Sequence, residues 1–110
     1  MGHTRIILTQ LPPMLADLIG QLLDDGTEVR AAASTSGAEL IEEASQTRAD
    51  VVITSDDVTT AEQMRLSASL PGVVVIFIDA RGRSGARYVD GRLEIGSEDL
   101  SPDILRELLR

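Results

Sequence analysis

The sequence predicts an α/β fold in which a parallel sheet is covered by helices on both faces. Short apolar runs rich in β-branched residues alternate with segments whose leucines recur at helical spacing. The connections between them are only a few residues long, which is typical of βαβ units with right-handed crossovers. Residues 73–78 are the most continuously apolar run, a pattern that favours a central strand covered on both faces.

The first half of the chain contains two expected strands and a helix between them. Residues 4–9 form the first strand, because the run is short, apolar and β-branched. A helix is expected within residues 11–26, where two prolines suit the first turn and Gly26 suits a C-terminal cap. A second strand follows at residues 27–34. The apolar face of the helix consists of Leu11, Met14, Leu15, Leu18, Ile19, Leu22 and Leu23.

Two further helices are predicted to begin at capping boxes, in which the side chain of the first residue caps the backbone three residues later. The third strand, residues 50–54, lies between these helices. The second of the two helices extends to about residue 69, before a Pro-Gly pair. The capping-box pairs are Ser36 with Glu39 and Thr59 with Glu62.

The alternation of strand and helix stops after residue 79. The glycine-rich segment that follows is too short for a helix, and residues 87–95 contain two short β-prone pieces. Asp90 and Gly91 separate these pieces, and an Asp-Gly pair is a strong signal for a two-residue hairpin turn. Residues 100–110 close the chain as a helix, with Ser101 as N-cap and a proline in the first turn.

Length and composition limit the classes of function. We expect residues 1–110 to form one domain, because this is an ordinary domain length. The chain has no cysteine, which excludes a disulfide framework, a thiol nucleophile and cysteine-ligated zinc. A net charge of −8 disfavours nucleic acid as a partner, because a protein binds nucleic acid largely by neutralising its phosphates with positive side chains. No apolar run approaches the ~20 residues of a membrane span and no signal peptide is present, so we expect a cytoplasmic protein without a membrane partner.

The order and lengths of these elements resemble the receiver domain of two-component response regulators. The resemblance covers residues 4–80 and the last helix. Two segments compare directly with the family's typical sequence: RIILTQLPPML at the first strand and DVVITS at the third. It implies a flavodoxin-like (CheY-like) three-layer αβα fold with strand order 2-1-3-4-5. The predicted hairpin then replaces the fourth helix of that family.

The resemblance also implies a phosphorylation pocket, which this chain fills with other residues. The family's Mg²⁺-binding acidic pair falls on Gln10 and Leu11, and its phosphorylated aspartate falls on Ser55. Asp79 replaces a threonine or serine, and the chain has no lysine to hold phosphoryl oxygens. The complete degenerate pocket comprises Gln10, Leu11, Ser55, Asp56, Asp57 and Asp79.

These replacements remove the chemistry of phosphoryl transfer to a carboxylate. That reaction needs Mg²⁺ to offset negative charge, and Mg²⁺ prefers hard oxygen ligands that include carboxylates. A serine without a neighbouring base is also a far weaker nucleophile than a carboxylate. The sequence therefore predicts a pseudo-receiver that is not phosphorylated, is not an enzyme, and uses no metal or cofactor.

Asp56 and Asp57 leave two alternatives open. A one-residue step along a strand turns a side chain to the other face, so Asp56 is expected to point away from a pocket that Ser55 faces. The simplest interpretation is that both are solvated acids at the entrance of a helix. The alternatives are an atypical phosphoacceptor at Asp56 or Asp57, and a weak cation site formed by Asp57 and Asp79.

Three arginines after the fourth strand define another candidate site. Arg81, Arg83 and Arg87 lie among glycines, and arginine forks match phosphate geometry. A small-anion or nucleotide sensor at the carboxyl ends of the strands is therefore the alternative function. The spacing matches no phosphate-binding loop, which favours a loop with solvated arginines.

The favoured function is a stand-alone protein–protein interaction or signalling module. The hairpin gives the sheet a new edge, and receiver domains commonly form pairs, so we expect a homodimer through residues 85–110. The sequence does not identify any other protein partner.

Overall fold

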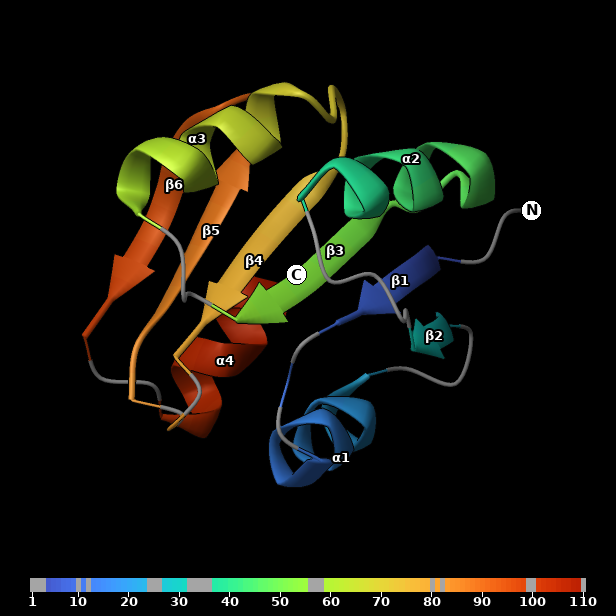
Figure 1. Ribbon diagram of the computed structural model, residues 1–110. Coiled ribbons are helices and arrows are strands. Elements are labelled where there is room, and N and C mark those ends of the chain that lie inside the picture. The colour runs from blue at the N-terminus through green and yellow to red at the C-terminus, as the bar shows by residue number, and fades with distance from the viewer. Residues whose placement is uncertain are drawn as a thin grey trace.

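The computed structural model describes residues 4–9, 11, 13–23, 27–31, 37–55, 59–79, 81, 83–98 and 101–109. Six strands and four helices lie in this described part of the chain, and they confirm the α/β class (Figure 1). The elements, in chain order, are β1 (Thr4–Leu8), α1 (Pro13–Leu22), β2 (Thr27–Ala31), α2 (Gly37–Thr47), β3 (Val51–Ser55), α3 (Thr60–Ala68), β4 (Val74–Ile78), β5 (Gly85–Val89), β6 (Arg92–Ser97) and α4 (Pro102–Leu109).

The sheet is mixed: the first four strands are parallel, as the alternation of strands and helices predicts, whereas the fifth strand, which the resemblance implies to be parallel, is not. Its strand order is β2-β1-β3-β4-β5-β6, and β1 to β4 are parallel. β5 runs antiparallel to β4, and β6 runs antiparallel to β5. The physical reason is the length of the connection: residues 79–84 are too few for a crossover, which needs a dozen residues or more.

Helices cover both faces of the sheet, with α2 and α3 on one face and α1 and α4 on the other (Figure 1). Alternate residues of the central strands therefore belong to two separate apolar clusters. The α1/α4 cluster contains Ile6, Leu8, Leu15, Ile19, Val51, Ile53, Ile76, Ile78, Leu105 and Leu108. The α2/α3 cluster contains Ile7, Leu40, Ala44, Ala49, Val52, Leu70, Val75, Phe77 and Tyr88.

The predicted helix starts that fall on described residues are confirmed. The Glu62 N–H donates to Thr59 Oγ1 at 3.2 Å, so Thr59 is the N-cap of α3. The Ile104 N–H donates to Ser101 Oγ at 3.3 Å at the start of α4. The predicted caps Ser36 and Gly26 lie outside the described residues. None of the described helices is both long and apolar enough to span a bilayer.

The predicted hairpin turn is confirmed and lies against α3. Asp90 and Gly91 have φ angles of 51° and 80°, as a type I′ turn requires. The Gly91 N–H donates to Ser67 Oγ of α3 at 3.0 Å, and the Gly72 N–H donates to Asp90 Oδ1 at 2.9 Å. These bonds fix the β5–β6 turn to the carboxyl-terminal part of α3 and to the loop before β4.

Replacing Arg48 with glycine is expected to raise the free energy of unfolding by about 1 kcal/mol. Arg48 is exposed and has a φ of 54° at the end of α2, where the Ala49 N–H bonds the Ala44 carbonyl at 3.0 Å. Glycine adopts this left-handed helix end without steric cost. Urea unfolding would measure the gain. Arg48→Ala is the control, and equal stability of the two variants would contradict the prediction.

Candidate functional site

The carboxyl ends of β3 and β4 bring two predicted site residues to the same end of adjacent strands. Ser55 is the last residue of β3 and is paired in register with Ile78 of β4. Asp79 directly follows Ile78, and its N–H donates to the Ser84 carbonyl at 2.9 Å. The Ser55 side chain is buried, with 4% of the residue exposed, whereas Asp79 is partly exposed.

The predicted pocket residues Leu11 and Ser55 belong to the α1/α4 side of the sheet. Leu11 is partly buried and packs against the α1/α4 cluster. Val51 and Ile53 of β3 belong to the same cluster, so Ser55, two residues further, faces the same side. An apolar side chain and a buried hydroxyl offer no carboxylate to a divalent cation.

Three members of the predicted pocket, Gln10, Asp56 and Asp57, lie outside the described residues, so their roles stay predictions. Within the described ranges, no three or more histidine, aspartate or glutamate side chains form a group that could hold a metal ion. What the structure brings together at this end of the sheet is therefore Leu11, Ser55 and Asp79.

The three predicted anion-binding arginines have different environments. Arg81 and Arg83 are exposed between β4 and β5. Arg87 lies on β5, and only 15% of its side chain is exposed. Its Nε is 3.0 Å from Glu94 Oε1, and another guanidinium N–H donates to the Leu108 carbonyl at 3.1 Å. The guanidinium of Arg87 thus holds β6 and the end of α4, and anion binding by Arg81 and Arg83 stays a prediction.

An open groove of about 500 Å³ lies on the α2/α3 side of the sheet. We call it the α3–β6 groove, because its lining residues come mainly from α3, β5 and β6, with Phe77 from β4. The small residues Gly85, Ala86 and Gly96 line it, together with Leu93, whose exposed fraction is 55%. Sequence reasoning did not identify this groove, because strand periodicity does not reveal which part of a sheet a helix leaves uncovered.

Two aromatic side chains form the buried wall of the α3–β6 groove. The rings of Phe77 and Tyr88 meet edge to face, with centroids 5.5 Å apart and an interplanar angle of 89°. The Tyr88 hydroxyl donates to Oε1 of the buried Gln63 at 3.0 Å, which joins β5 to α3. Both aromatic residues are therefore packing residues of the α2/α3 cluster.

Replacing Tyr88 with phenylalanine is expected to lower the free energy of unfolding by about 1–2 kcal/mol, because the buried Gln63 amide loses its hydroxyl donor. Urea unfolding of the single variants Tyr88→Phe and Gln63→Met and of the double variant would measure their coupling. We expect a coupling of about 1 kcal/mol. Additive effects of the two substitutions would contradict an energetic role for the 3.0 Å bond.

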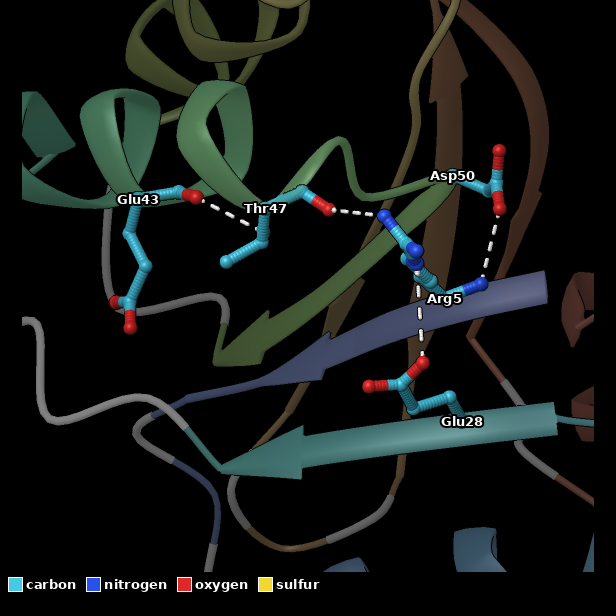
Figure 2. A network of polar contacts seen from close by, with 5 residues as sticks. All are labelled: Arg5, Glu28, Glu43, Thr47 and Asp50. Carbon is cyan, nitrogen blue, oxygen red and sulfur yellow. Dashed lines mark hydrogen bonds and ion pairs between the residues drawn. The ribbon is translucent and has the colours of Figure 1, made fainter. Parts of the chain in front are cut away.

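A second polar cluster lies at the opposite, amino-terminal end of the central strands, around Arg5 (Figure 2). The Arg5 guanidinium donates to the Thr47 carbonyl at 3.1 Å and lies 3.7 Å from Glu28 Oε2. The Arg5 backbone N–H donates to Asp50 Oδ2 at 2.9 Å, and the Thr47 hydroxyl donates to the Glu43 carbonyl at 2.9 Å. A hollow of about 300 Å³ adjoins this cluster.

The Arg5 cluster is structural, because each contact of Arg5 joins β1 to another part of the chain: to β2, to α2 or to the residue before β3. The guanidinium caps the carboxyl end of α2, where the helix dipole favours a cation. The Arg5–Glu28 pair links β1 to β2, and its side chains are 50% and 53% exposed. Such exposed ion pairs contribute about 0–1 kcal/mol each.

Two places on the chain thus remain as candidates for function: the strand ends at Ser55 and Asp79, and the α3–β6 groove. Of these two, the groove combines an open concave surface with an exposed apolar side chain, Leu93, which also lines a hollow of about 570 Å³ beside the β5–β6 turn. Comparison of the chain with protein-family models, with curated proteins and with solved structures found no match.

Proposed function

We propose that this chain is a receiver-like, cytoplasmic protein-interaction module that is not phosphorylated and that binds its partner at the α3–β6 groove. The observation that carries the proposal is the apolar side chain of Leu93. Leu93 of β6 lines this groove, and 55% of the residue is exposed. Exposed apolar side chains beside a concave surface are typical of places where proteins bind one another.

The strand order supports the receiver-like part of the proposal. The strand order β2-β1-β3-β4 in the sheet, with helices on both faces, is compatible with a flavodoxin-like arrangement. Beyond β4 the chain continues as the β5–β6 hairpin, where the resemblance implies a helix followed by a parallel strand. The hairpin therefore changes the surface through which a receiver-like domain contacts other proteins.

The environment of Ser55 supports the absence of phosphorylation. Ser55 is buried at the end of β3, and Leu11 packs into the apolar cluster on the same side of the sheet. We expect no phosphoryl adduct when the chain is incubated with Mg²⁺ and acetyl phosphate. Intact-mass measurement is the readout. An adduct removed by Asp56→Asn or Asp57→Asn would instead favour the atypical phosphoacceptor.

Capture of binding partners from a native lysate tests the interaction site. Leu93→Asp places a charge on the rim of the groove, and Met14→Asp places the same charge on α1, where Met14 is 79% exposed. Both side chains are exposed, so both variants are expected to fold. We expect the wild-type chain and Met14→Asp to retain the same partner and Leu93→Asp to lose it. Equal retention by all three would contradict the proposed site.

A further inference from the structure

In the described part of the chain, β6 is the last strand of the sheet and forms its edge (Figure 1). The pairing of β6 with β5 is irregular. Tyr88 pairs with Leu93 and Arg87 pairs with Ile95, which leaves Glu94 as an additional residue in β6. This is a β-bulge, and bulges are one of the devices that keep edge strands from pairing with other chains.

The bulge changes the alternation of side chains along β6. Glu94 contacts Arg87, whose guanidinium also bonds the last turn of α4, and Ile95 packs against the α1/α4 cluster. Glu94 and Ile95 are therefore consecutive residues on the same face. Leu93 and Gly96, on either side of them, both line the α3–β6 groove on the other face.

We propose that β6 pairs antiparallel with β6 of a second copy, about a two-fold axis between Glu94 and Ile95. This inference rests on the proposed function and names the partner as the chain itself. Directly opposite residues of paired strands share a face. In a regular strand, consecutive side chains point to opposite faces, so a regular strand cannot place two consecutive residues opposite Glu94 and Ile95 on one face. A second copy of β6 can, because it carries the same bulge. Leu93 then lies opposite Gly96 of the second copy, and Glu94 lies opposite Ile95 of the second copy.

The charge near the axis fits this pairing, and Gly96 brings no side chain of its own to it. A Cβ built on Gly96 would meet the methyl groups of Leu93 of the same copy, at 3.6 and 3.8 Å, so Leu93 lies over Gly96 within one copy. Glu94, the acid nearest the axis, is already neutralised by Arg87 at 3.0 Å. The exposed residues of α4 include Asp103, Arg106 and Glu107, which are charged. Within residues 85–110, Leu93 is the large apolar side chain that the described structure exposes.

A cross-linking experiment tests this register, because the natural chain has no cysteine. Leu93→Cys and Gly96→Cys would be purified separately, oxidised alone and as an equal mixture, and analysed on non-reducing gels. Opposite residues come within disulfide distance, so we expect roughly tenfold more cross-linked dimer in the mixture than in either variant alone. Equal cross-linking of Leu93→Cys alone, or no cross-linked dimer in any sample, would overturn the proposal.

Matched controls separate this inference from the proposed function. Met14→Cys mixed with Gly96→Cys carries an exposed thiol on α1 and is expected to give no cross-linked dimer. Light scattering of the wild-type chain is expected to give twice its mass of 11.8 kDa. A monomer that still captures a partner sensitive to Leu93→Asp would refute self-pairing and leave the interaction site standing. If the chain forms the cross-linked dimer but captures no other protein that depends on Leu93, self-pairing is supported. The second copy is then the partner of the interaction module.

Discussion

Replacing Phe77 with alanine is expected to lower the free energy of unfolding by about 3–5 kcal/mol, because it leaves a cavity where an aromatic ring is buried. Phe77 is 1% exposed at the centre of the α2/α3 cluster. Its ring packs edge to face on Tyr88, and the two are the only aromatic residues in the chain. The loss is a large part of a typical domain stability of about 5–15 kcal/mol.

Urea unfolding followed by circular dichroism would measure the effect of Phe77→Ala. Leu93→Ala is the control, because it removes an exposed apolar side chain and is expected to change stability by less than about 0.5 kcal/mol. If the two substitutions had equal effects, Phe77 would not be buried as described. Phe77→Leu is expected to recover part of the loss, since it leaves a smaller cavity.

Replacing Gly91 with alanine is expected to lower the free energy of unfolding by about 2–3 kcal/mol. Gly91 has a φ of 80°, which an alanine adopts only with strain. A Cβ at this position would also lie 3.0 Å from Ala68 Cβ, tighter than an ordinary contact. The substitution would therefore push the hairpin turn away from α3 and weaken the Gly91–Ser67 bond of 3.0 Å.

Gly20→Ala provides the matched control for Gly91→Ala. Gly20 lies exposed in α1, and a Cβ there meets nothing within 4 Å. Alanine is a better helix former than glycine, so we expect Gly20→Ala to raise stability by about 0.5–1 kcal/mol. The same chemical change should thus have opposite signs at the two positions, as thermal or urea unfolding would show. Stabilisation by both substitutions would contradict the described turn.

The elements of the fold could be predicted from the sequence because their signals are local. Apolar periodicity located the strands and helices, and the cap at Thr59 and the turn at Asp90 and Gly91 depend on residues close in sequence. The antiparallel direction of β5 was missed, although the length of residues 79–84 already requires it. The parallel expectation came from the resemblance, which implies a helix that this segment cannot contain.

The candidate sites were less predictable because they depend on tertiary packing. The sequence placed Ser55 and Asp79 at neighbouring strand ends, but it could not show that Ser55 is buried. Arg87 was grouped with Arg81 and Arg83, because its partners Glu94 and Leu108 come from elements that periodicity alone does not place beside it. The exposure of Leu93 likewise depends on where α3 ends its coverage of the hairpin.

Two neighbouring residues of β5 make contacts on opposite faces of the sheet, and these contacts fix the register of the hairpin. Tyr88 is anchored to α3 through Gln63, while Arg87 is anchored to α4 through the Leu108 carbonyl. A shift of the strand by one position would turn each of these side chains to the other face of the sheet. Arg87 would then lie beneath α3, and the ring of Tyr88 would lie on the α4 side. Misaligned versions of this hairpin would therefore lose both anchors at once, which leaves one alignment strongly preferred during folding.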